Sequence, residues 1–240
     1  MYSVIFIGLC CTMNFSYYYN NVPGFGPCRN NLIYTSLISD DKKTFVQWYH
    51  NDTDYHKGMN EVVDPELMKE KWARELCYLT DMTKWYPDLV PKILEIDLRE
   101  KKIYLEIDGV DFWERSGCLT ENYDAIVPDW QEQMLNIFKA HKELNMWKYS
   151  LHPSSYFVVD GQLKSINYFF TYQTGEGPIT VRDHLSHISE GRRAEMKPKT
   201  DAMGIDWDTP QTLHTMQMLT FESFRNNYPA EFIEKAKDVF

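Results

Sequence analysis

The feature that most constrains the fold of this chain is an Asp-Gly pair between two strand-forming runs. Residues 156–159 precede Asp160 and Gly161, and residues 163–166 follow them. Such a pair joins antiparallel strands in a tight turn, because both of its residues accept positive φ angles. The sequence therefore predicts a β-hairpin here. In the chain, this hairpin follows a long helix that we expect to begin at Pro128.

Further upstream, the patterns predict two more hairpins with a helix between them. Runs rich in β-branched and aromatic residues occupy 31–38 and 44–49, and similar runs occupy 93–97 and 102–107. Between these hairpins, Pro65 takes the first position of a helix whose apolar residues recur every three or four positions. The first half of the chain is therefore rich in strands.

The last part of the chain has helical patterns. We expect helices at 180–190, 210–225 and 229–239, with loops around 173–178 and 197–209. A strand-rich N-terminal half followed by a helix-rich C-terminal half is typical of the α+β class.

Composition excludes several classes of protein. The 240 residues include 25 Lys and Arg against 35 Asp and Glu, which gives a net charge of −10. This acidity argues against nucleic acid as a partner, because phosphate-backbone binding needs clustered cations. Aromatic residues make up 15% of the chain and exclude a disordered protein. Five cysteines without a CxxC pair indicate reduced thiols and a cytoplasmic location.

The beginning of the chain is apolar but short. Residues 1–14 contain too few apolar positions to span a bilayer, and they lack the basic start and cleavage site of a signal peptide. We expect an apolar extension here, with Met13 rather than Met1 as the natural start. A weak signal or anchor segment is the alternative. We expect no membrane partner.

Residues 148–169 carry a more specific pattern. The run 150–155 reads Ser-Leu-His-Pro-Ser-Ser, the hairpin follows, and 167–169 reads Asn-Tyr-Phe. This block resembles the protein-kinase-like fold of protein kinases and aminoglycoside or choline phosphotransferases. There, an Asp is followed five positions later by Asn, then by a hairpin that ends in Asp-Phe-Gly. The resemblance implies two lobes: a small N-lobe at 15–110, with an antiparallel sheet and one helix, and a reduced helical C-lobe at 111–240.

At the catalytic positions implied by the resemblance, this chain has other residues. Trp48 stands for the phosphate-holding Lys, Ser150 for the catalytic Asp, Ser155 for the metal-binding Asn and Asn167 for the metal-binding Asp. A neutral amide lacks the anionic oxygen that a hard cation prefers, and a lone serine is no base near neutral pH. The resemblance therefore implies a catalytically inactive pseudokinase, and we expect no metal and no cofactor.

Three further residues belong to the vestigial cleft that the resemblance implies. Glu75 lies on the N-lobe helix and has lost its lysine, so we expect it at the surface or bonded to a loop. Asp108 falls at the hinge between the lobes. His152 lies in the loop block, where we expect a structural hydrogen bond rather than catalysis.

The assignment of Trp48 depends on the register of its strand. We expect Trp48 and Asn167 to face a common cleft. If the strand is shifted, Lys42, Lys43 or Lys57 would substitute for the missing lysine.

Two alternatives stay open. One is an active but divergent phosphotransferase that uses ATP and Mg²⁺ with relocated carboxylates, for which Asp108, Asp111 and Asp160 are the nearby candidates. The other is a different α+β domain whose hairpin only mimics the kinase hairpin.

Two histidine groups suggest a metal site but lack the required ligands. Residues 50–56 alternate His and Asp without the Gly and Glu of an EF-hand, so we expect a solvated loop. His184 and His187 share a predicted helix face but have no evident third ligand.

The chain is also similar to small uncharacterised kinase-like proteins of marine cyanobacterial phages, in the runs 19–27, 148–169 and 223–229. This resemblance implies a phage-encoded binding or regulatory protein in the host cytoplasm. It also implies a protein partner, with a host protein as the natural choice.

Overall fold

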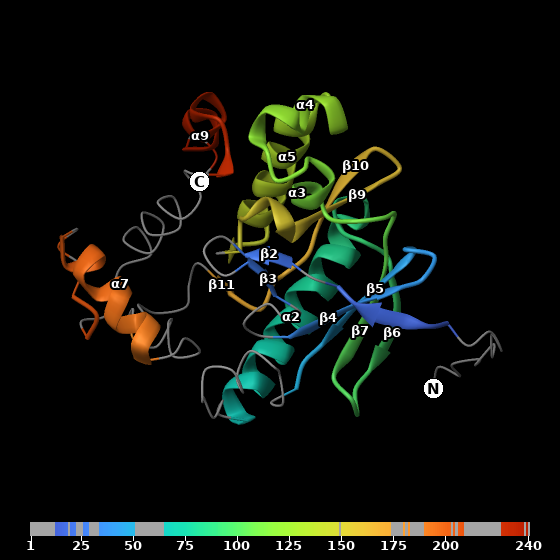
Figure 1. Cartoon of the computed structure of the whole chain (residues 1–240), viewed down its shortest axis with the longest axis horizontal. Helices are drawn as coiled ribbons and strands as arrows, with labels where there is room; N and C mark the ends of the chain where they lie inside the picture. The colour runs from blue at the N-terminus through green and yellow to red at the C-terminus, as the bar shows by residue number, and fades with distance from the viewer. Residues whose placement is uncertain are drawn as a thin grey trace.

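The computed structural model of the chain has a mixed α+β fold (Figure 1). A five-stranded antiparallel sheet near the N-terminus is followed by helices and small two-stranded sheets, so the expected fold class is confirmed. The structure describes residues 13–18, 20–22, 26–28, 34–50, 65–148, 150–173, 190–202, 206–208 and 227–237, with the single positions 180, 182, 204 and 239.

The large sheet contains both upstream hairpins that the sequence predicts. Its spatial order is β1 (Phe15–Tyr17), β4 (Thr35–Ser39), β5 (Thr44–Trp48), β7 (Lys102–Glu106) and β6 (Ile93–Asp97). All neighbouring strands are antiparallel. Strand β1 is not predicted by the sequence, because three residues give no periodic signal.

One long helix covers the sheet. Helix α2 (Pro65–Trp85) begins at the predicted proline, and Figure 1 shows it running along the sheet. Its buried residues, among them Met68 and Leu79, join the core cluster that contains Phe45 and Leu105 of the sheet. Because these apolar residues recur at helical spacing, they form one continuous stripe toward the sheet.

The remaining elements form two groups. Two small strands, β2 (Asn20–Val22) and β3 (Gly26–Cys28), pair with each other. Of the others, η1 (Pro87–Leu89) lies between α2 and β6 in the chain. The rest follow the sheet: α3 (Phe112–Arg115), η2 (Thr120–Asn122), α4 (Tyr123–Ile126), α5 (Trp130–Glu143), β8 (Met146–Lys148), η3 (Pro153–Ser155), β9 (Tyr156–Val159), β10 (Gln162–Ser165), β11 (Thr171–Gln173), α7 (Glu190–Ala202) and α9 (Ala230–Lys237).

The predicted hairpin at Asp160 and Gly161 is present. Strands β9 and β10 pair antiparallel, and the two turn residues have φ angles of 52° and 76°. The Gln133 side chain on α5 accepts a hydrogen bond from Leu163 N at 2.7 Å and donates one to the Gly161 carbonyl at 3.2 Å. The hairpin is therefore fixed to α5 at its turn.

A second core lies around α5. It gathers the buried side chains of Phe112, Trp130, Met134 and Phe232 with other apolar residues. The ring centres of Trp130 and Phe232 lie 4.7 Å apart, so α9 packs against α5. The predicted helix at 229–239 is confirmed by α9.

One loop prediction is wrong. The region 197–209 begins inside α7, which extends to Ala202 and contains Pro198. Its other residues are mostly good helix formers, and Lys197 pairs with Asp201 one turn later at 2.8 Å, so together they outweigh the proline. The predicted helices at 180–190 and 210–225 and the predicted loop at 173–178 lie almost entirely outside the described residues.

Among the residues whose structure is described, no helix combines the length and apolar character needed to cross a membrane.

Candidate functional site

Asn167 is the centre of a buried polar network between the sheet and the hairpin. It follows β10 with a left-handed φ of 69°, a conformation that asparagine tolerates better than most residues. Its Oδ1 accepts hydrogen bonds from the Tyr34 hydroxyl at 2.5 Å and from Gln47 Nε2 at 3.3 Å. Its Nδ2 donates to Ser155 Oγ at 2.9 Å. The side chains that contact the Asn167 amide are all neutral.

The strand register explains why Gln47, and not Trp48, belongs to this network. Neighbouring residues of a strand point to opposite faces of the sheet. Gln47 points toward Asn167, whereas the Trp48 ring lies 4.1 Å from the His50 ring and 4.5 Å from Lys102 Nζ on the other face. The expectation that Trp48 faces Asn167 is therefore wrong: the preceding residue, Gln47, takes that place.

Glu75 joins the network from α2. Its carboxyl is fully buried, and Oε2 accepts a hydrogen bond from Phe169 N at 2.8 Å. The expected bond to a loop is present, whereas the alternative of a surface position is wrong. Burial raises the pKa of Glu75 to about 7, opposed by the positive charge of Lys148 and by the nearby Tyr49 and Gln47 side chains.

Lys148 on β8 is the buried cation beside this carboxyl. Burial lowers the pKa of Lys148 to about 7, and the charge of Glu75 opposes that shift. The ammonium donates a hydrogen bond to the Ser150 carbonyl and lies 5.4 Å and 5.5 Å from the ring centres of Tyr156 and Tyr168. Ser150 thus touches this cluster through its main chain.

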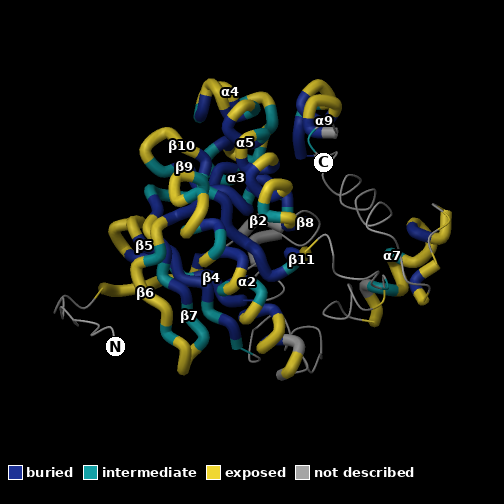
Figure 2. The backbone as a smooth tube through the Cα atoms, turned by 180° about the vertical axis from the view of Figure 1, so that it is seen from behind, coloured by how far each residue is buried: buried dark blue, intermediate teal, exposed yellow. Residues whose placement is uncertain are grey.

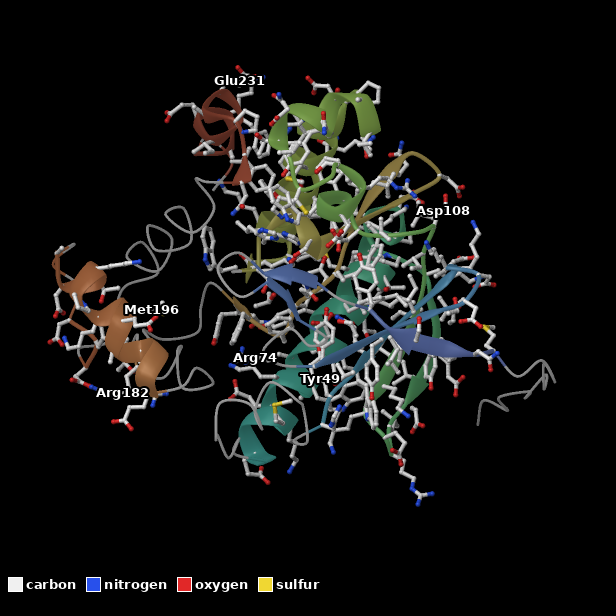
Figure 3. The ribbon with its side chains drawn as sticks, viewed as in Figure 1. Tyr49, Arg74, Asp108, Arg182, Met196 and Glu231 are labelled. Carbon is white, nitrogen blue, oxygen red and sulfur yellow. The ribbon has the colours of Figure 1, made fainter. Side chains whose placement is uncertain are left out.

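Two residues of the expected cleft lie elsewhere. The Asp108 carboxylate pairs with Lys43 Nζ at 2.5 Å near the surface, and this contact lowers its pKa. Figure 3 shows Asp108 well apart from Tyr49, whose ring lies 5.3 Å from that of Tyr34 in the network. His152 caps η3, where its Nδ1 accepts a hydrogen bond from the backbone N–H two residues later.

The cap on η3 is the structural hydrogen bond expected for His152. Its ring also lies 5.3 Å from that of Trp113. Burial lowers the pKa of His152 to about 4, so the imidazole is neutral at physiological pH.

The carboxylates proposed for an active enzyme differ in their surroundings: Asp108 and Asp160 both raise the pKa of Lys43, whereas Asp111 is buried. Asp111 is buried, caps α3 through Glu114 N and accepts a hydrogen bond from the Tyr18 hydroxyl at 2.7 Å. Burial raises its pKa to about 7. Asp160 is exposed at the hairpin turn, at the opposite end of β10 from Asn167. Within the described ranges, no three His, Cys, Asp or Glu side chains are placed to hold a metal ion.

Sequence reasoning missed three residues of the network. Gln47 shares a face with the buried Phe45, but β5 is buried on both faces, so its sequence gives no signal of which residues face Asn167. Lys148 lies between two aromatic residues, a weak signal of burial. Tyr34 precedes a strand and carries no distinguishing pattern. The candidates Lys57, His184 and His187 lie outside the described residues, as do positions 51–56.

No protein-family model matches the chain, and no curated protein matches its sequence.

Proposed function

We propose that this chain is a catalytically inactive protein of the kinase-like fold that binds or regulates a protein partner. The five-stranded sheet with its single helix, followed by a helical part that carries the β9–β10 hairpin, supports an N-lobe at 15–110 and a C-lobe at 111–240. The resemblance to phage proteins supports a phage-encoded chain that acts on a host protein in the host cytoplasm.

The observation that carries this proposal is the saturated amide of Asn167. Its Oδ1 has two lone pairs, and both are occupied by the donors Tyr34 and Gln47. Magnesium prefers anionic oxygens with near-octahedral geometry, and this oxygen is neither anionic nor free. The position that would hold the metal in an active kinase-like protein is thus occupied by contacts within the chain.

The electrostatics support the same proposal. Phosphoryl transfer depends on cations that neutralise the phosphate oxygens. Lys148 is buried beside Glu75 and two aromatic rings, and Lys71, which is also buried, lies 4.8 Å from the centre of the Phe170 ring. Gln47 provides no charge where the proposed fold would need a lysine.

An assay of ATP turnover tests this proposal. Purified protein is incubated with γ-labelled ATP, Mg²⁺ or Mn²⁺ and general phosphate acceptors. We expect no label transfer and no phosphate release above that of buffer. Turnover that is lost in Asp108→Asn or Asp160→Asn would instead establish the divergent phosphotransferase.

A further inference from the structure

The β6 edge of the sheet presents an apolar surface. Within the described residues, β6 has a neighbouring strand, β7, on one side only. Leu94 and Ile96 on this strand are 44% and 36% exposed, and Leu98 in the following turn is 70% exposed. Residues 94–96 of β6 and residues 98–100 of the turn after it are exposed, and Figure 2 colours the chain by this burial. Such an edge offers unpaired main-chain groups to an added strand.

The two sides of β6 differ in chemistry. Ile96 pairs with Ile103, which is fully buried, so this side continues the apolar face that α2 covers. Glu95 pairs with Tyr104 and points to the other side, as does Asp97. Both carboxylates raise the pKa of Tyr104, after the larger effect of its burial. One side is therefore apolar, and the other carries the carboxylates of Glu95 and Asp97, with Lys102 of β7 opposite Asp97.

A second copy of the chain fits this edge poorly. Antiparallel pairing of β6 with its own copy would set the Glu95 and Asp97 side chains of both copies on the same face. Like charges opposite each other destabilise a strand pair, and two chains of charge −10 also repel each other.

We propose that β6 accepts, as an added strand, an extended segment of a partner protein in which apolar residues alternate with Lys or Arg. The apolar residues would meet the Ile96 side, and the basic residues would meet Glu95 and Asp97. Main-chain hydrogen bonds supply affinity in this mode of recognition, and alternate side chains supply specificity. The proposal rests on the protein-binding part of the proposed function and requires no nucleotide.

The test measures binding of three labelled heptapeptides to the full chain by fluorescence anisotropy at physiological salt. The first peptide alternates Val with Lys or Arg, the second alternates Val with Glu or Asp, and the third is the basic peptide with N-methylated backbone. We expect the basic peptide to bind about tenfold more tightly than the acidic one. N-methylation removes the ladder hydrogen bonds, and we expect it to weaken binding by about tenfold as well.

Matched variants locate the site. Glu95→Lys is expected to weaken binding of the basic peptide about fivefold or more, and Ile96→Ser to weaken it comparably. Glu121→Lys makes the same charge change at an exposed position of η2 and should leave binding unchanged. Thermal unfolding verifies that each variant is folded.

The proposal is overturned if none of the peptides binds, or if the acidic peptide binds as well as the basic one. It is also overturned if the N-methylated peptide keeps its affinity, or if Glu121→Lys weakens binding as much as Glu95→Lys. The last two results would indicate general attraction to an acidic chain. All of these measurements are made without ATP, so their failure is distinct from failure of the pseudokinase proposal.

Discussion

The Tyr34 hydroxyl donates a hydrogen bond of 2.5 Å to Asn167 Oδ1, and the two residues are 133 positions apart in the sequence. Gln47 donates to the same oxygen, and Ser155 accepts from the other end of the amide. The sheet and the hairpin are therefore joined by contacts of the chain itself. In the proposed fold, an active protein would use this position for metal and phosphate.

Removing the hydroxyl of Tyr34 should weaken this junction. Tyr34→Phe keeps the ring contacts with Phe45 and Phe169 but leaves Asn167 Oδ1 with one donor. We expect the free energy of unfolding to fall by about 1 kcal/mol, the usual net worth of a buried hydrogen bond. Urea denaturation measures this change.

The matched control for this substitution is Tyr104→Phe, on the other face of the sheet, where the ring is only partly buried. We expect it to change the free energy of unfolding by less than about 0.5 kcal/mol. Equal losses for the two variants would contradict a special role for Tyr34.

Introducing a carboxylate at position 167 should destabilise the fold. Asn167→Asp removes the amide that donates to Ser155 Oγ and buries a negative charge. We expect the free energy of unfolding at pH 8 to fall by about 2–4 kcal/mol, and by less at pH 5, where the carboxyl is more often protonated. Denaturation at the two pH values measures both effects.

A lysine at position 47 should rescue part of that loss. In Gln47→Lys/Asn167→Asp the two new charges replace the hydrogen-bonded pair of the native chain. A double-mutant cycle should give a coupling energy of about 1 kcal/mol or more in favour of the pair. Additive effects of the two substitutions would show that positions 47 and 167 do not interact, and would contradict the revised register of β5.

The buried carboxyl of Glu75 should make stability depend on pH. Its pKa is about 7 in the folded chain against 4.5 for the ordinary side chain. Between these values the folded state binds more protons than the unfolded state, so stability falls as pH rises. We expect wild type to lose up to about 3 kcal/mol relative to Glu75→Gln from pH 4.5 to pH 7. A constant difference between the two proteins across this range would contradict the raised pKa.

Much of the fold follows from local patterns in the sequence. The turn at Asp160 and Gly161 and the start of α2 at Pro65 are set by residues with narrow backbone preferences. The pairing of β8 with β11 could not be predicted, because it joins two three-residue strands distant in sequence. Helix α7 was obscured by Pro198, whose local preference is outweighed by the residues around it.

The candidate site was predicted only in part. Asn167 contacts Ser155, and Glu75 contacts the backbone of Phe169 two residues after Asn167; the elements that carry these residues have clear sequence signals. Trp48 was placed one residue out of register, since a buried strand shows no alternation of polarity that would orient it. Whether a lysine such as Lys148 is buried depends on tertiary packing and is not visible in its neighbours.

The most direct test of the central claim is a thermal-shift measurement of the full chain with millimolar ATP, in the presence of Mg²⁺ and again with EDTA. A ligand that binds the native state raises the melting temperature by mass action. Because Asn167 Oδ1 is already saturated by Tyr34 and Gln47, we predict the same melting temperature with and without nucleotide. A rise of several degrees that requires Mg²⁺ would contradict the account.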